Sequence, residues 1–242
     1  MYKNKKIGII GGGNLGNNTW DLFARNNDVI VYDLIPEKCS PVGTIFNDIL
    51  DCYIVIICIS VPIVNGIIDT DIIIDLVGRL QNNKINKIIL RTKIPPGTCD
   101  SLNTYYFPYF IKNKDIKDSI IFGIPKDNNE DDVKEWITKS IDSNVTFLSA
   151  IQTEIIILST MSYLTVKFAF LKELQYYCKS IGIKFDEIEN HLLNNEIILN
   201  LDEKKNEKYL LNDISSLEYE IRKSNISTSI LSATIRRLSE IN

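Results

Sequence analysis

KIGIIGGGNLG, which spans Lys6–Gly16, joins a short apolar run to a turn that satisfies G-x-G-x-x-G at Gly11, Gly13 and Gly16. The run predicts a buried strand, the residues after the turn predict a helix, and Asp33 closes the next apolar run, VIVYD. In such a unit the first glycine permits the tight turn, the second lets backbone approach a pyrophosphate, and the third allows close helix–strand packing. The stretch therefore predicts a Rossmann-type dinucleotide-binding turn.

The same turn indicates which dinucleotide would bind. A helix N-terminus offers N–H groups and a partial positive charge to phosphates. Asp33 would accept hydrogen bonds from the adenosine ribose and repel a 2′-phosphate, which favours NAD over NADP. The predicted cofactor-binding residues are Gly11, Gly13, Asn14, Leu15, Gly16, Asp33 and Ser60. Alternatively, the glycines only permit packing and Asp33 is a solvated strand end, because a fold can keep its turn after losing its ligand.

Strand and helix patterns alternate through the first half of the chain. The predicted strands after the turn are Val29–Asp33, Tyr53–Ile59, Lys87–Thr92, Ser119–Ile124 and Val145–Ser149. The predicted helices are Asn14–Arg25, Asp71–Leu80 and Asp131–Ile141. Alternation of this length implies βαβ units with right-handed crossovers. We expect an α/β fold, with a Rossmann-like doubly wound parallel sheet in a domain of about residues 1–150.

The second half is helical throughout. Residues 151–180 form one long helical pattern without Gly or Pro, and Gly182 follows as a C-cap candidate. Further helices are predicted at Phe185–Leu193, Asp213–Arg222 and Ser227–Ile241, and the polar stretch Leu201–Lys208 is predicted to be a linker. We expect a smaller all-helical domain, about residues 151–242, built on the long helix.

Composition excludes several classes of function. The net charge is -4 and the basic residues are scattered, which disfavours a nucleic-acid surface. The longest apolar stretch, Tyr53–Pro62, is about half of the ~20 residues that span a bilayer. The five cysteines are odd in number and form no CxxC pair, which favours a reduced, cytoplasmic setting.

Several segments of the chain match one known family in order. They are KIGIIGGGNLG, VIVYDLIPEK, YIVIICISVP, LRTKIPPGTCDSL with its Pro-Pro-Gly-Thr turn, and the long helix TEIIILSTMSYLTVKFAFLKELQYYCKSIGI. Over about Lys6–Ser216 the chain resembles the UDP-glucose/GDP-mannose dehydrogenase family. The resemblance implies NAD as cofactor and oxidation of a sugar 6-hydroxyl to a carboxylate in two hydride transfers. The family's third domain, which binds the nucleotide sugar, is expected to be absent.

The resemblance also assigns catalytic positions, and this sequence departs from the family at most of them. The family uses a cysteine nucleophile, a lysine and an asparagine on the central helix, a glutamate base and a threonine. Those positions fall on Tyr209, Ile157, Met161, Tyr109 and Lys93, the last beside Thr92, and a further lysine position falls on Asn212. The positions that match are Glu154, Lys167, Glu173 and Asp213.

Each departure removes a chemical function. A phenol with a pKa near 10 is a poor substitute for a thiolate, and isoleucine cannot stabilise an alkoxide as an ammonium can. Related hydroxyacid dehydrogenases carry the same lysine and asparagine, so Ile157 and Met161 argue against their chemistry too. We therefore expect a catalytically inactive UDP-glucose 6-dehydrogenase-like protein that acts as a binding or structural module. The alternatives are an active NAD-dependent oxidoreductase that acts on a nucleotide sugar with a rearranged site, using Lys93, Tyr109 or a partner subunit, and a scaffold without cofactor.

The remaining candidates have simpler explanations. His191 is the only histidine and has no accompanying ligand cluster, so no metal site is expected. Cys52 and Cys58 are expected to act as small buried hydrophobes. Residues 130–132 (Glu-Asp-Asp) fit a helix N-terminus. Lys93 is expected to be a solvated loop residue and Lys167 a partner of a carboxylate such as Glu173.

The long helix predicts an oligomer. Its apolar residues cover most of its circumference, and such a helix needs partners on several sides. In the resembling family this helix forms the dimer core, so we expect a homodimer through residues 151–180. The alternative is a helix buried inside one monomer.

Overall fold

The computed structural model describes residues 5–108, 119–127, 131–141, 143–180, 182–194, 207–223 and 228–241. The chain divides into two compact units. The first comprises Met1–Pro62 with Ile68–Ile157, and the second Ile63–Ile67 with Leu158–Asn242. The expected domain boundary at residue 150 stays a prediction, and Ala150–Ile157 pack with the sheet unit.

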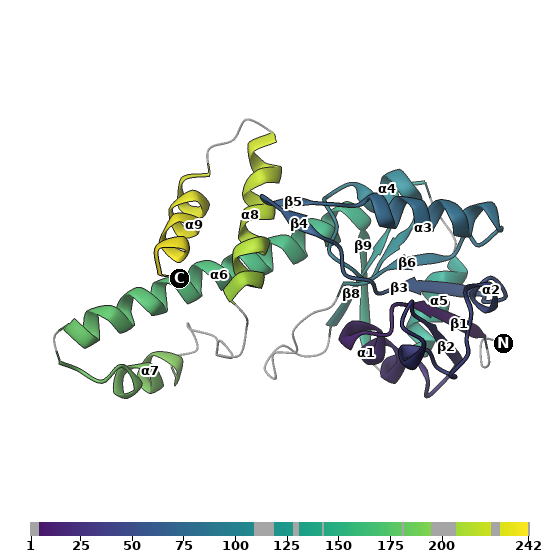
Figure 1. Cartoon of the computed structure of the whole chain (residues 1–242), viewed down its shortest axis with the longest axis horizontal. Coiled ribbons are helices and arrows are strands. Elements are labelled where there is room, and N and C mark those ends of the chain that lie inside the picture. Colours follow the sequence, from purple (N-terminus) through teal and green to yellow (C-terminus); the bar gives the residue numbers. More distant parts are fainter. Residues whose placement is uncertain are drawn as a thin grey trace. The chain divides into compact units, whose positions relative to one another are not determined.

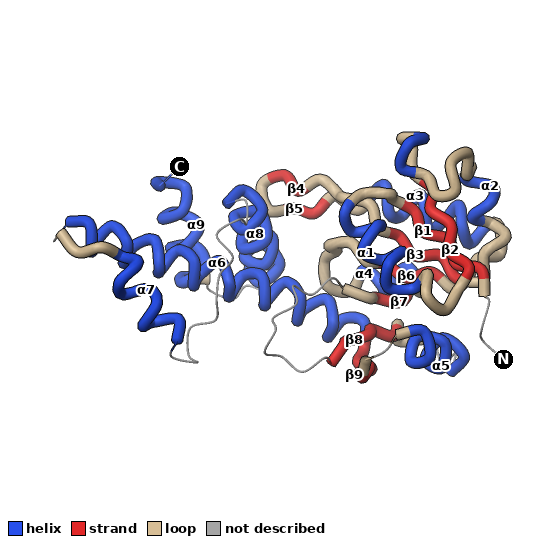
Figure 2. Tube along the Cα trace, turned by 90° about the horizontal axis from the view of Figure 1, so that it is seen from below, coloured by secondary structure: helices blue, strands red, loops and turns tan. Residues whose placement is uncertain are grey.

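A seven-stranded sheet organises the first unit (Figures 1 and 2), in the order β2-β1-β3-β6-β7-β8-β9. The strands are β1 (Lys6–Ile10), β2 (Asp28–Tyr32), β3 (Ile54–Ile57), β6 (Ile88–Leu90), β7 (Tyr105–Tyr106), β8 (Ser119–Ile124) and β9 (Asn144–Ser149). Neighbours pair in parallel, except that β7 and β8 are antiparallel. The Rossmann-like α/β prediction is confirmed, with the correction that the sheet is mostly rather than wholly parallel. Strand β7 is not predicted by the sequence pattern.

Both faces of the sheet are covered, which explains its nearly continuous apolar strands. The helices of this unit are α1 (Asn14–Phe23), α2 (Phe46–Ile49), α3 (Asp71–Asn82), α4 (Thr98–Leu102) and α5 (Asp131–Ser140), with a short 3-10 turn, η1 (Pro36–Lys38). One core joins Val55 and Ile57 to α3, and the other joins Ile54 and Ile56 to α1 and α5. In Figure 1, α3 and α1 lie on opposite sides of the strands.

The glycine turn lies where the strand order reverses. From β1 the chain crosses to β2 on one side, and from β2 it returns to β3 on the other. A reversal of this kind opens a crevice at the carboxyl ends of the two central strands, where α/β proteins bind ligands. Here the two ends are close, because a Cβ on Gly11 would lie 2.8 Å from the carbonyl oxygen of Cys58, just after β3.

The second unit contains helices and one hairpin. Its helices are α6 (Ala150–Ser180), whose first turns belong to the sheet unit, α7 (Phe185–Asn194), α8 (Glu207–Lys223) and α9 (Ser229–Ile241). Strands β4 (Ile63–Val64) and β5 (Ile67–Ile68) form a hairpin that reaches α8. Asn65 and Gly66 at its tip both have positive φ, and a Cβ on Gly66 would lie 2.7 Å from the Ser215 carbonyl oxygen.

One expectation for this part is revised. Of the predicted linker, residues 201–206 lie outside the described part, and Glu207 and Lys208 begin α8 instead. Within the described residues no helix is long and apolar enough to cross a membrane.

Candidate functional site

The glycine turn is held in place by backbone contacts. The Gly11 N–H donates to the Tyr32 carbonyl over 2.8 Å, and Gly11 has φ +106°, which suits only glycine. A Cβ on Gly16 would overlap the Gly11 carbonyl oxygen, so α1 can approach the turn only with glycine there. Gly11 and Gly16 therefore have the structural roles that the sequence predicts.

Gly13 faces open space instead. No atom lies within 4 Å of the position that its Cβ would occupy, although its backbone, at φ -78°, is one that any residue adopts. Gly13 is the N-cap of α1 and no side chain caps the helix. The first helical hydrogen bond runs from Asn17 N–H to Gly13 O, so the N–H groups of Asn14, Leu15 and Gly16 have no acceptor within the helix. This open N-terminus can receive an anion.

Asp33 lies beside the turn and follows β2 directly. Its Oδ2 accepts a hydrogen bond from Gly12 N–H at 2.7 Å, and its Oδ1 accepts one from Ile35 N–H at 2.9 Å. A carboxylate oxygen has two lone pairs, so each oxygen keeps the capacity for one further donor. The carboxylate is thereby oriented and still able to bind a hydroxyl group.

The loop after β2 forms a wall against the turn. Val31 and Ser40 exchange backbone hydrogen bonds of 2.7 and 2.9 Å, which fold residues 33–40 back on β2. A Cβ on Gly12 would overlap the Lys38 carbonyl, so the wall touches the turn backbone to backbone. Leu34, at 85% exposed, projects from this loop beside Asp33.

These residues fit a dinucleotide. Gly13 leaves space, the helix N-terminus supplies donors, and Asp33 has unused acceptor capacity. Ser60 is exposed just past β3, at the same carboxyl edge. The structure thus brings together the predicted cofactor residues from β1, α1, β2 and β3.

Of the catalytic positions assigned from the resemblance, the structure describes the side chains of Ile157, Met161, Lys93 and Asn212. Ile157 is 7% exposed, and Met161 and Lys93 are partly buried. Tyr109 lies outside the described residues, and Tyr209 is described only as part of the α8 backbone. Lys167 is buried and its Nζ makes no hydrogen bond within the described part of the chain. The expected Glu173 partner stays a prediction, because the Glu173 side chain is not described.

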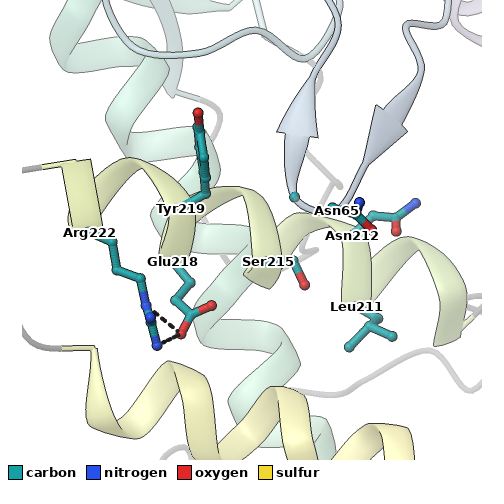
Figure 3. Close-up of a pocket in the computed structure, with 8 residues that line it drawn as sticks. Asn65, Leu211, Asn212, Ser215, Glu218, Tyr219 and Arg222 are labelled. Atoms are coloured by element: carbon teal, nitrogen blue, oxygen red, sulfur yellow. Dashed lines mark hydrogen bonds and ion pairs between the residues drawn. The ribbon is translucent and has the colours of Figure 1, made fainter.

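A hollow of about 430 Å³ lies in the helical unit (Figure 3). It is lined by Asn65, Gly66, Leu211, Asn212, Ser215, Glu218, Tyr219 and Arg222. Figure 3 shows Asn65 at the hairpin tip next to Asn212, and Glu218 paired with Arg222 at 2.9 Å. Asn212, which stands at a lysine position of the family, is partly buried and lines this hollow, whereas the neighbouring Asp213 is 1% exposed.

Glu154 makes a contact that the sequence did not predict. Its side chain, on the second turn of α6, is fully buried. Oε2 accepts a hydrogen bond from Gly97 N–H at 2.6 Å and Oε1 accepts one from Cys99 N–H at 2.8 Å. Burial raises the pKa of this carboxyl group, against the lowering effect of the two N–H donors. Glu154 thus caps α4 and fixes the Pro-Pro-Gly turn.

Two of the buried cysteines have thiols that burial makes unreactive, and the histidine lies on the surface. Burial raises the pKa of Cys58 and of Cys52 to about 11, so neither thiol is ionised at neutral pH. His191 is exposed on α7. Among the described residues, no three His, Cys, Asp or Glu side chains are placed to hold a metal ion.

Residues 131–132 begin α5, where acidic residues suit the helix dipole. Asp132 also pairs with Lys87 at 2.6 Å and accepts a hydrogen bond from the Tyr53 hydroxyl at 2.7 Å. Lys87 precedes β6 and Tyr53 precedes β3, so this network lies at the amino ends of the strands, opposite the glycine turn. It ties α5 to the sheet.

The sequence matches no protein-family model and no curated protein. Solved structures match instead. A UDP-glucose dehydrogenase from Pyrobaculum islandicum is similar over 99% of this chain and 69% of its own, with a TM-score of 0.79 and 13% identity. A UDP-D-ManNAc dehydrogenase from Pyrococcus horikoshii is similar over 97% and 68%, with a TM-score of 0.78 and 15% identity.

A shorter enzyme matches across nearly its whole length. The 3-hydroxyisobutyrate dehydrogenase from Mycobacterium tuberculosis is similar over 98% of this chain and 94% of its own, with a TM-score of 0.71 and 10% identity. The chain therefore has a fold that is also found over about two thirds of the length of these nucleotide-sugar dehydrogenases and over most of the hydroxyisobutyrate dehydrogenase. At these identities the similarity establishes the fold alone.

Proposed function

We propose that this protein binds NAD at the Gly11–Gly16 turn and acts as a binding or structural module rather than as a dehydrogenase. NAD binding is supported by two features of this turn: the open helix N-terminus at Gly13 and the oriented carboxylate of Asp33. The pyrophosphate would lie against the N–H groups of residues 14–16, and the ribose hydroxyls would donate to Asp33. When bound, NAD supplies a hydride acceptor.

The residues at the catalytic positions of the resembling family support the absence of dehydrogenase activity. A buried isoleucine, Ile157, stands where the resembling enzymes carry a lysine, and it contributes to the core beside the sheet. Isoleucine neither transfers a proton nor stabilises a negative charge. An active enzyme would need other reactive groups at the carboxyl edge of the sheet, such as Lys93. This is the rival proposal of a rearranged active site.

We also propose that the protein is a homodimer joined through α6. Ile151, Ile155 and Tyr163 are 39%, 45% and 57% exposed, and they recur at intervals of four and eight residues. Residues spaced by multiples of four form a ridge along a helix, and the exposed Ser159 lies on this ridge between Ile155 and Tyr163. This apolar stripe, interrupted by Ser159, is a candidate surface for a second copy of the helix.

We propose a reducing, intracellular setting as well. All five cysteines are buried and none forms a disulfide. Structural disulfides are rare in the cytosol and common in secreted domains.

Calorimetric titration with NAD tests the proposal, followed by a screen for NAD reduction with nucleotide sugars and 3-hydroxy acids. The proposal expects micromolar binding and no turnover at any protein concentration. Absence of binding at millimolar NAD would overturn the cofactor half. Turnover that disappears in Lys93→Ala would establish the rival, an active oxidoreductase.

A further inference from the structure

The second residue of the glycine turn is fixed by its neighbours rather than by its own backbone. The fingerprint leaves this position free for any side chain, and the φ of Gly12 lies outside the left-handed region that favours glycine. A Cβ on Gly12 would nevertheless overlap the Lys38 carbonyl oxygen and would lie 2.8 Å from the Lys38 Cβ. Glycine is therefore required here because the wall of residues 33–40 lies directly against the turn.

The wall is tied together, so its position at Lys38 also sets the position of Asp33. The Lys38 N–H donates to the Ile35 carbonyl at 2.9 Å, and the Cys39 Sγ contacts both the N–H and the carbonyl oxygen of Asp33 at 3.4 Å. Ser40 closes the loop on β2 through its two backbone hydrogen bonds with Val31. A displacement of Lys38 from the turn would therefore displace Asp33 as well.

We propose that Gly12 is a positioning residue for the nucleotide and that it sets the preference for NAD over NADP through Asp33. Because Gly12 has no side chain, the wall closes on the turn and the Gly12 N–H reaches Asp33 Oδ2 at 2.7 Å. This bond holds the carboxylate beside the turn, where it accepts a ribose hydroxyl and repels a 2′-phosphate. The role rests on the proposed NAD site, and it goes beyond the fingerprint, which assigns no task to this position.

A methyl group on residue 12 would affect one half of the site and leave the other intact. It would push the Lys38 backbone outward and lengthen the bond from the Gly12 N–H to Asp33, so the carboxylate would lose its fixed orientation. The pyrophosphate space would stay open, because no atom lies within 4 Å of the position that a Gly13 Cβ would occupy. A carboxylate without this bond accepts the ribose hydroxyl less well and can turn away from a 2′-phosphate. NAD should therefore lose more affinity than NADP.

Calorimetric titration of NAD and of NADP into the full chain tests this role. Gly12→Ala should reduce the ratio of NAD affinity to NADP affinity by about tenfold, the effect expected from one hydrogen bond to a charged group. A variant that is only less stable would lose both affinities in equal proportion, so a change in the ratio identifies positioning. Gly78→Ala is the matched control, since a Cβ at Gly78 on α3 would have no atom within 4 Å, and it should keep both affinities.

Two further measurements follow the effect to Asp33. In a protein that already carries Asp33→Ala, Gly12→Ala should cause no further change in the ratio, because the effect passes through Asp33. Hydrogen exchange of the ligand-free wild type serves if Gly12→Ala fails to fold. The Gly12 amide, which donates to Asp33, should exchange more slowly than the amides of Asn14 and Leu15, which have no acceptor within the helix.

Two results would overturn the role of Gly12. One is an unchanged ratio of the two affinities in Gly12→Ala. The other is a wild-type Gly12 amide that exchanges as fast as those of Asn14 and Leu15. A wild type that binds neither nucleotide would overturn the proposed cofactor site itself, an outcome distinct from NAD binding with an unchanged ratio.

Discussion

The backbone N–H of Gly12 donates to Oδ2 of Asp33 over 2.7 Å, a hydrogen bond that joins the glycine turn to the end of β2 across 21 residues of sequence. The other oxygen of Asp33 accepts the Ile35 N–H, so one carboxylate orients both the turn and the wall beside it. Asp33 thus stabilises the local fold in addition to making the predicted ribose contact. Its substitutions must therefore be tested for their effects on stability and on NAD affinity separately.

Asp33→Ala should weaken NAD binding and also lower the free energy of unfolding. A hydrogen bond to a charged group contributes about 1.5–3 kcal/mol, and because the bond from Ile35 is exposed and water can replace it, the stability loss should be about 2 kcal/mol, mostly from the bond to Gly12. Asp33→Asn keeps one acceptor oxygen and should lose less stability than Asp33→Ala. Calorimetry with NAD and urea unfolding measure the two effects separately.

Asp69→Ala is the control for Asp33, because the exposed Asp69 carboxylate also accepts a backbone N–H, from Asp71 at 3.1 Å. It should leave NAD affinity unchanged. Equal NAD affinity in wild type and Asp33→Ala would show that the ribose does not contact this carboxylate.

Alanine substitutions at Gly13 and Gly16 should have different effects, the first on NAD binding and the second on stability. Gly13→Ala adds a methyl group where no atom lies within 4 Å, so folding should be unaffected and NAD binding should weaken at least tenfold because the methyl group enters the pyrophosphate space. Gly16→Ala forces an overlap with the Gly11 carbonyl and should destabilise the protein by about 3 kcal/mol or more. Thermal unfolding and NAD titration of both variants check this contrast. A Gly13→Ala protein with wild-type affinity would argue that the turn serves packing alone.

Local signals predicted the turn, its two strands and Asp33, because these features lie within one βαβ unit. The hairpin at Ile63–Ile68 also has a local signal, because Asn65-Gly66 between apolar residues is typical of a tight hairpin turn, and both residues adopt positive φ. The antiparallel β7 is two residues long and has no readable period.

Other features could not be predicted from sequence. Glu154 meets Gly97 and Cys99 across 57 and 55 residues, and no spacing rule connects them. The same holds for Asp132, which was predicted as a helix N-terminal residue but also pairs with Lys87. Contacts of this kind depend on how the sheet brings distant segments together.

The Tyr53–Lys87–Asp132 network should make stability depend on pH. Burial alone would raise the pKa of Asp132, but the hydrogen bonds from Lys87 and Tyr53 outweigh it and lower the pKa below 3.8. Burial would likewise lower the pKa of Lys87, and its partners raise it above 10.5. The stabilisation is therefore present between about pH 4 and pH 10 and is lost as pH falls through the lowered Asp132 pKa or rises through the raised Lys87 pKa.

Asp132→Asn should cost about 1 kcal/mol of unfolding free energy at pH 7, a figure that allows for solvent screening of this partly exposed pair, and less at pH 3. Urea unfolding at both values measures it. Glu135→Gln is the control on the same helix, because Glu135 pairs with Lys139 one turn away on the surface, and its cost should be smaller. An Asp132→Asn cost that is equal at pH 7 and pH 3 would contradict the electrostatic explanation.

The apolar stripe on α6 gives the last prediction. Ile155 is 45% exposed at the centre of the stripe formed with Ile151 and Tyr163, so Ile155→Asp would place a charge inside a homodimer interface. An unpaired buried charge is strongly unfavourable, and the dimer should dissociate at micromolar concentration while each subunit stays folded. Ile230→Asp is the matched control, since Ile230 is 71% exposed on α9 and lies outside the stripe. Sedimentation velocity of the three proteins would show a dimer, a monomer and a dimer, whereas a monomeric wild type would mean that α6 keeps its apolar stripe for another partner.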